Sequence, residues 1–70
     1  MESKHRKRLG KRVAAIRAKK HLSQETLAEK IGISRGFLSD IERGTRHMSV
    51  ETLACFCRAT KTPSSDLLGI

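Results

Sequence analysis

A chain of 70 residues has room for one folded core, because a protein this small buries only about 60% of the surface that its unfolded chain exposes. Hydrophobic residues make up 37% of the chain and its only aromatic residues are two Phe, which favours a helical core over a β-sandwich or a disordered chain. Fifteen Lys and Arg against seven Asp and Glu give a net charge of +8, which favours a polyanionic partner, either nucleic acid or an acidic membrane surface.

Several classes of protein are disfavoured. No apolar run approaches the length of about 18 residues that spans a bilayer, and no apolar segment follows the charged N-terminus, so we expect neither membrane insertion nor secretion. Cys55 and Cys57 lie too close together to staple a fold and do not have the spacing of a zinc site, so a reducing compartment suits them. The three histidines, His5, His21 and His47, share no ligand spacing, so we expect no metal and no cofactor.

The chain begins with a predicted basic N-terminal arm, residues 1–8, which is followed by one predicted domain over residues 9–70. The charged side chains of the arm could lie along a phosphate backbone or belong to a frayed, solvated tail. A first helix is expected from residue 9 to about residue 20, because apolar residues recur there at a helical spacing. These residues are Leu9, Val13 and Ile16.

Three later helix starts share one pattern, an apolar residue directly before a Ser and a Leu four residues after that Ser. The Ser oxygen accepts a hydrogen bond from an unpaired helix N–H, and the apolar pair sets the direction in which the helix starts. The three sets are Leu22-Ser23-Leu27, Ile33-Ser34-Leu38 and Met48-Ser49-Leu53. They predict helices over residues 24–31, 35–43 and 50–60. Gly32 and Gly44 end the first two of these, because glycine readily adopts the left-handed conformation of a helix C-cap.

The last part of the chain completes an all-α fold. The helix over 50–60 is expected to bury one apolar face, made of Val50, Leu53 and Cys57 with Phe56 beside them. A short fifth helix is expected to start with Thr62 as its cap and Pro63 at the first helical position, where the missing N–H costs nothing. Leu67 and Leu68 are its predicted core residues.

Two short helices joined by the three-residue turn 32–34 have the arrangement that places the second helix in a DNA major groove. The stretch from Leu22 to Gly44 resembles the helix-turn-helix signature of the Xre/Cro-type repressors. The residues in register with that signature are Ser23-Gln24, Leu27-Ala28, Gly32, Ser34-Arg35 and Ile41-Glu42-Arg43-Gly44. The resemblance extends from about Leu9 to Leu68 and implies a five-helix, lambda-repressor-like DNA-binding domain. Restriction-modification controller proteins come closest, although phage repressors and antitoxins share the pattern.

The resemblance also implies roles for three polar residues. In the family, the residue at Gln24 contacts the DNA backbone, which agrees with its place at a helix N-terminus, where free N–H groups favour a phosphate. The family pairs the acid at Glu42 with an Arg late in the first helix, the position that Arg17 occupies here, so we expect a partly buried structural ion pair. The family usually has Gly where His21 stands, so we expect His21 to adopt a positive φ.

Base reading is predicted for the exposed face of helix 35–43. Arg35 can present two donors to guanine O6 and N7. At Gly36 either the backbone approaches DNA closely or the glycine is merely tolerated. Phe37 could touch a thymine methyl group or be a core-edge aromatic residue. Asp40 could accept a hydrogen bond from cytosine N4 or be a solvated or Arg-paired acid.

Beyond the helix, Arg43 and Arg46 are predicted phosphate clamps, with solvated surface arginines as the alternative. The complete predicted DNA-contact set is Gln24, Ser34, Arg35, Gly36, Phe37, Ser39, Asp40, Arg43 and Arg46.

We therefore expect a sequence-specific transcription regulator, a repressor or controller, that binds double-stranded DNA at a near-palindromic operator as a homodimer with helix 35–43 in the major groove. Its expected place is the cytoplasm of a bacterium or phage host, associated with the nucleoid. The alternative is an antitoxin whose DNA binding is autoregulatory. An enzyme is not expected, because no nucleophile–base pair, carboxylate pair or phosphate-cradling loop is present.

Overall fold

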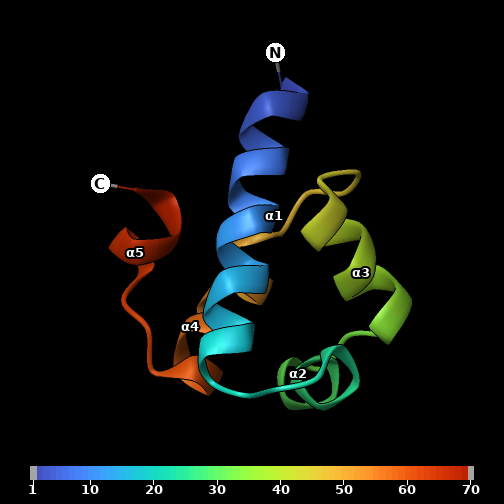
Figure 1. Ribbon diagram of the computed structural model, residues 1–70, viewed down its shortest axis with the longest axis vertical. Helices are drawn as coiled ribbons and strands as arrows, with labels where there is room; N and C mark the ends of the chain where they lie inside the picture. Colours follow the sequence, from blue (N-terminus) through green and yellow to red (C-terminus); the bar gives the residue numbers. More distant parts are fainter. Residues whose placement is uncertain (1, 70) are drawn as a thin grey trace.

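Five α-helices make up the fold: α1 (Glu2–Lys19), α2 (Gln24–Ile31), α3 (Arg35–Arg43), α4 (Val50–Thr60) and α5 (Ser64–Leu68) (Figure 1). The computed structural model describes residues 2–69, so Met1 of the predicted arm and Ile70 of the predicted domain lie outside the described residues. No strand occurs within residues 2–69, which confirms the all-α prediction. None of the helices in this part of the chain has the length and apolar character needed to cross a membrane.

The predicted start of the first helix is wrong, because α1 begins at Glu2 and not near residue 9. The added residues make about two turns. They lie against the loop after α3, where Arg6 Nε donates to the carbonyl oxygen of Gly44 at 3.3 Å and Arg6 Nη1 lies 3.0 Å from His47 Nε2. The segment has no apolar periodicity, so contacts with residues some 40 positions away support a helix that the local pattern did not indicate.

The three Ser caps are confirmed. Ser23, Ser34 and Ser49 accept hydrogen bonds from the backbone N–H three residues later, at 3.0, 3.0 and 3.1 Å. Gly32 and Gly44 end α2 and α3 with φ values of 79° and 82°. The bounds of α2 and α3 therefore agree with those predicted.

Two residues other than glycine adopt a positive φ, His21 at 60° and Lys61 at 53° within the described residues. The first confirms the conformation expected for His21. Lys61 is the C-cap of α4. The predicted cap of the last helix is wrong by one residue, because Pro63 is the N-cap of α5 and Thr62 precedes it. Thr62 is buried instead, and its hydroxyl donates to the carbonyl oxygen of Thr60 at 3.2 Å.

All five helices contribute to one core. Its fully buried large side chains are Val13, Leu27, Leu38, Ile41, Phe56 and Leu67. Arg12 Nη1 donates to the Leu67 carbonyl oxygen at 3.2 Å and so ties α5 to α1.

For two residues the prediction that they lie in the core is wrong. Val50 is 82% exposed and Leu68 is 49% exposed. The buried face of α4 is centred on Phe56 and Thr60, one helical turn apart. Leu53 and Cys57 of the predicted stripe are partly buried and pack against the core, but Val50 does not. Burial of Thr60 is possible because its hydroxyl donates to the Phe56 carbonyl oxygen at 2.8 Å. Leu67 fills the core in the short α5, which leaves its neighbour Leu68 on the outer side.

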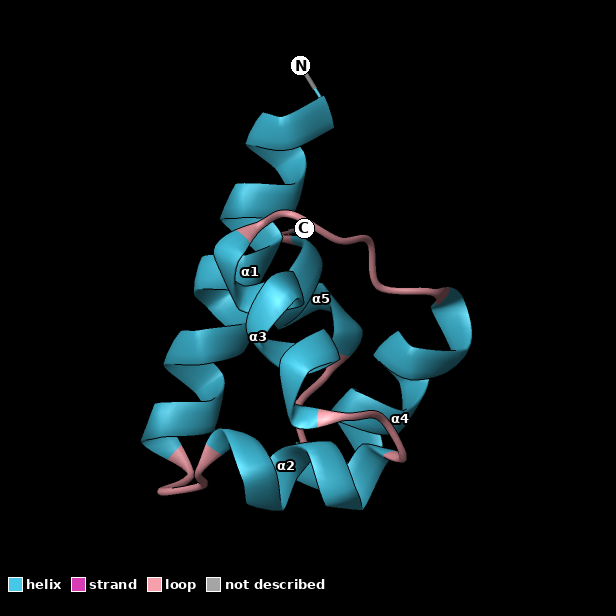
Figure 2. Ribbon diagram, turned by 90° about the vertical axis from the view of Figure 1, so that its right-hand side faces the viewer, coloured by secondary structure: helices cyan, strands magenta, loops and turns pink. Residues whose placement is uncertain are grey.

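The position of α3 is set by its packing against α1 and α2. α1 passes beside α3, and α2 lies across the end of the molecule below both (Figures 1 and 2). α1 and α3 come so close at Gly10 that a Cβ atom there would lie 2.6 Å from the carbonyl oxygen of Glu42 and would also overlap that of Ile41. Glycine is thus the residue that allows this close crossing of two helices.

Candidate nucleic-acid interface

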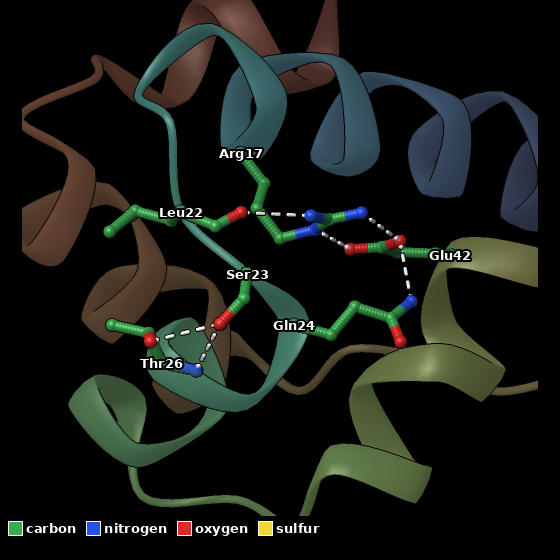
Figure 3. A network of polar contacts seen from close by, with 6 residues as sticks. All are labelled: Arg17, Leu22, Ser23, Gln24, Thr26 and Glu42. Carbon is green, nitrogen blue, oxygen red and sulfur yellow. Dashed lines mark hydrogen bonds and ion pairs between the residues drawn. The ribbon is translucent and has the colours of Figure 1, made fainter.

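A polar network joins α1, the start of α2 and the end of α3 (Figure 3). The Arg17 guanidinium contacts both carboxylate oxygens of Glu42, with Nε 2.7 Å from Oε2 and Nη2 3.1 Å from Oε1. Its third donor, Nη1, bonds the Leu22 carbonyl oxygen at 2.8 Å. The structure thus brings together the two residues of the implied ion pair, and their side chains are only 20% and 8% exposed.

The network accounts for an acid near a surface that we expect to face DNA. The hydrogen bond with Glu42 raises the pKa of Arg17 above its ordinary value, against the opposing effect of burial, so the guanidinium remains charged. The carboxylate of Glu42 points toward α1 and α2, where it is neutralised. Its charge therefore does not oppose a polyanion at the outer face of α3 as an exposed acid would.

Gln24 takes part in the same network. Its Nε2 donates to Glu42 Oε1 at 2.9 Å, and its side chain is partly buried. The amide nitrogen carries two N–H donors, so one remains available for a phosphate at the N-terminus of α2. The acid thus orients the amide at the place where the family resemblance puts a backbone contact.

At its N-terminal end, the outer face of α3 carries two exposed residues. Arg35 and Gly36 are exposed, and the Arg35 side chain makes no hydrogen bond or ion pair with the described residues. A Cβ atom at Gly36 would meet nothing within 4 Å. Ser34 acts as the N-cap of the helix, and Ser39 is partly buried. The opposite face of the helix is fixed in the core by Leu38 and Ile41.

A second cluster, the Asp40 cluster, consists of Phe37, Asp40, Arg43 and Arg46. Asp40 Oδ1 lies 2.6 Å from Arg43 Nη2, and Oδ2 lies 3.5 Å from Arg46 Nε. The Arg46 guanidinium lies over the Phe37 ring at 5.4 Å from its centroid, a cation–π distance. The hydrogen bond from Arg43, followed by the contacts with Arg46, lowers the pKa of Asp40. Asp40 is therefore an Arg-paired acid in the DNA-free chain.

The cluster borders a hollow in the surface of about 350 Å³. It is lined by Ser34, Gly36, Phe37, Asp40 and Arg46. One wall is aromatic and another carries the carboxylate, so the hollow offers both an apolar surface and hydrogen-bond acceptors. The lack of a side chain at Gly36 keeps its rim open.

Another hollow, of about 660 Å³, lies between α4 and α5. Val50, Leu53, Ala54 and Cys57 give it a mainly apolar wall. Both cysteines are free, and burial raises the pKa of the Cys57 thiol. No group of three or more metal-ligating side chains occurs among the residues that the structure describes.

Sequence reasoning missed two contacts that position α3. Gly10 allows the close approach of α1, and the one signal in the sequence was a glycine within the predicted first helix, which is costly unless packing requires it. Lys7 lies against Gly44, where a Cβ atom would be 2.7 Å from the Lys7 Cα. Gly44 is therefore needed for this contact as well as for its left-handed conformation.

Comparisons with known proteins agree with this architecture. The helix-turn-helix family HTH_3 matches residues 13–67. The control protein C.BamHI of Bacillus amyloliquefaciens is 40% identical over 60 residues, which cover 84% of this chain and 74% of that protein. The immunity repressor of Bacillus phage phi105 is 39% identical over 61 residues, 87% of this chain, but the match spans only 42% of the repressor.

Solved structures give the same result. The restriction-modification controller protein C.AhdI from Aeromonas hydrophila superposes with a TM-score of 0.85 at 32% identity, covering 89% of this chain and 94% of that one.

An antitoxin, PezA of Streptococcus pneumoniae, is similar in sequence, at 33% identity over 61 residues that cover 87% of this chain and 39% of the antitoxin.

Proposed function

Because the chain belongs to the helix-turn-helix family that matches residues 13–67, we propose that it is a sequence-specific DNA-binding transcription regulator of the repressor or controller type. The observation that carries this proposal is the two-sided character of α3. Leu38 and Ile41 fix its inner face in the core, while Arg35, Asp40 and Arg43 lie on its outer surface. A rigid helix that presents donors in this way suits the major groove, where each base pair has a distinct pattern of donors and acceptors. The role is one of binding, without reaction chemistry.

In the proposed complex, some residues contact bases and others contact phosphates. Arg35 reads a guanine through its two donors, and the backbone at Gly36 approaches the DNA. Gln24 at the N-terminus of α2, together with Arg43 and Arg46, contacts phosphates. These phosphate contacts set the position of the helix, and the base contacts select the sequence.

We further propose that the regulator acts as a homodimer in the cytoplasm, on a near-palindromic operator. The exposed Val50 and the apolar hollow between α4 and α5 support association through this side of the molecule. A two-fold dimer would place two copies of α3 about 34 Å apart, one turn of DNA. Sedimentation of the free protein and of its DNA complex tests the stoichiometry, and a single copy on a palindromic duplex would contradict it.

The test of the function is selection of bound duplexes from a random DNA pool, followed by binding measurements over a range of salt concentrations. The log–log slope should be steep, because each neutralised phosphate contributes about −0.9. Arg35→Ala should lower affinity for the selected duplex by about 10-fold or more and leave other DNA nearly unchanged, since it removes a base contact. Arg46→Ala is the matched control, and should weaken binding to both. A slope near zero would refute DNA binding.

A second candidate is an antitoxin with autoregulatory DNA binding, which the similarity to PezA favours. Here, the chain would copurify from its native host with one partner in a fixed ratio. Recovery of the protein without a stoichiometric partner would reject this candidate and leave the regulator.

A further inference from the structure

We propose that Asp40 is a specificity-determining residue, which competes with phosphates for Arg43 and Arg46, so that their phosphate contacts are weakened on DNA that lacks a suitable base and reach full strength where one is present. The inference rests on the proposed DNA-binding function, and it names how the same surface rejects wrong sequences.

The first step concerns which groups share the outer surface of α3. The helix has two acids, and Glu42 is turned inward onto Arg17. Asp40 is 30% exposed and lies between two arginines whose side chains are 68% and 62% exposed. One carboxylate therefore engages both cations that are best placed to grip phosphates.

The second step concerns a duplex that offers Asp40 no partner. To reach phosphates, Arg43 must share or leave its 2.6 Å contact, and Arg46 must leave both Asp40 and the Phe37 ring. Asp40 would then stand unpaired beside phosphates of like charge. An ionised carboxylate has no donor to offer them, so the contact is repulsive. Binding to an arbitrary sequence is weakened as a result.

The third step concerns a matching base. In the major groove, a carboxylate can accept only from an exocyclic amine, such as cytosine N4 or adenine N6. The hollow of about 350 Å³ beside Asp40 leaves space for a base edge between the carboxylate and the Phe37 ring. There, the amine takes the place of an arginine as hydrogen-bond donor. Specificity then arises from a repulsive group whose effect is relieved at one kind of site.

The experiment compares Asp40→Asn with Asp66→Asn, a matched control that changes net charge equally but lies on α5, away from α3. The probes are the duplex selected by the wild-type protein and a shuffled duplex of the same length and composition. Asp40→Asn should raise affinity for the shuffled duplex by about 10-fold and steepen its salt slope by about 1, because an arginine is freed for a phosphate. The affinity ratio between the two duplexes should fall by at least about 5-fold.

Asp66→Asn should leave that ratio unchanged. Asparagine can itself bond a base, so Asp40→Ala provides a second variant, with the same gain expected on the shuffled duplex. Thermal unfolding checks that each variant is folded.

Equal effects of Asp40→Asn and Asp66→Asn would overturn the proposal and reduce Asp40 to its share of net charge. Weaker binding of both Asp40 variants to both duplexes would also overturn it, since Asp40 would then orient the arginines for phosphate contact. Failure of the proposed function looks different, because the wild-type protein would then bind neither duplex in a salt-dependent way.

Discussion

Glu42 illustrates how the meaning of a side chain depends on its partners. An exposed acid on a helix proposed to face DNA would oppose binding, but here its carboxylate accepts two bonds from Arg17 and one from Gln24. The same three side chains join α1, α2 and α3, so the pair stabilises the position of α3 as well as neutralising the acid.

Replacing Glu42 by Gln should therefore lower the free energy of unfolding by about 2 kcal/mol, because Arg17 would remain partly buried without its counter-charge. Urea denaturation measures the change. Glu29→Gln on α2 is the control, since Glu29 is exposed, and its effect should stay within about 0.5 kcal/mol. Equal effects of both substitutions would show that the network adds nothing to stability.

The ion pairs of Asp40 predict how its contribution to stability depends on pH. Its pKa is lowered in the folded chain, chiefly by the bond from Arg43, so its stabilising contribution is present above the pKa of an unfolded aspartate and is lost as the pH falls through the folded value. A carboxyl titration followed by NMR should place the Asp40 midpoint below the ordinary aspartate value. Arg43→Gln should move the midpoint upward, and by more than Arg46→Gln does. An unchanged midpoint in Arg43→Gln would contradict the assigned cause.

Helix packing places Gly10 and Gly36 in opposite surroundings. Gly10 lies where α1 meets the backbone of α3, and a Cβ atom there would overlap carbonyl oxygens that cannot move without shifting the helix. Gly36 has open space around it on the exposed side of α3. Each is the second residue of a helix predicted from the sequence, and only their surroundings distinguish them.

The same substitution should thus have opposite effects at the two positions. Gly36→Ala should raise the free energy of unfolding by about 0.5–1 kcal/mol, because alanine is the better helix former. Gly10→Ala should lower it by about 2 kcal/mol or more, because the helices must separate. Chemical denaturation of the two variants tests both, each serving as the control for the other. A stabilising Gly10→Ala would refute the close crossing of α1 and α3.

The charge of the whole molecule is distributed unevenly. Nine Lys and Arg and no acid occur from Lys4 to Lys20. Most of them lie on α1 and not on the outer face of α3, where we expect bases to be read. Such a field attracts any duplex over a distance of about 10 Å at 0.1 M salt and carries no sequence information.

Neutralising two exposed lysines of α1, in Lys4→Gln with Lys11→Gln, should therefore weaken binding to selected and shuffled duplexes alike. The salt slope should become shallower for both, and the affinity ratio between them should stay constant. Binding curves over a series of salt concentrations measure all three quantities. A change in the ratio would mean that α1 contributes to sequence reading.

Much of this architecture follows from local chemistry in the sequence. Ser caps with flanking apolar pairs, and glycines at helix ends, act over four or five residues, so they placed α2, α3 and the start of α4 correctly. The motif from Leu22 to Gly44 also indicated the family, because its residues are needed by the turn and by the packing of two adjacent helices.

Other features depended on residues that are distant in the chain. The first turns of α1 lie against Gly44 and His47, the buried face of α4 is centred on Phe56 and excludes Val50, and Asp40 pairs with Arg46 of the following loop. Helix periodicity defines a stripe but not the direction from which neighbours approach it, and an acid or a glycine is defined by what lies within a few ångströms. Those distances exist only once the five helices have packed together.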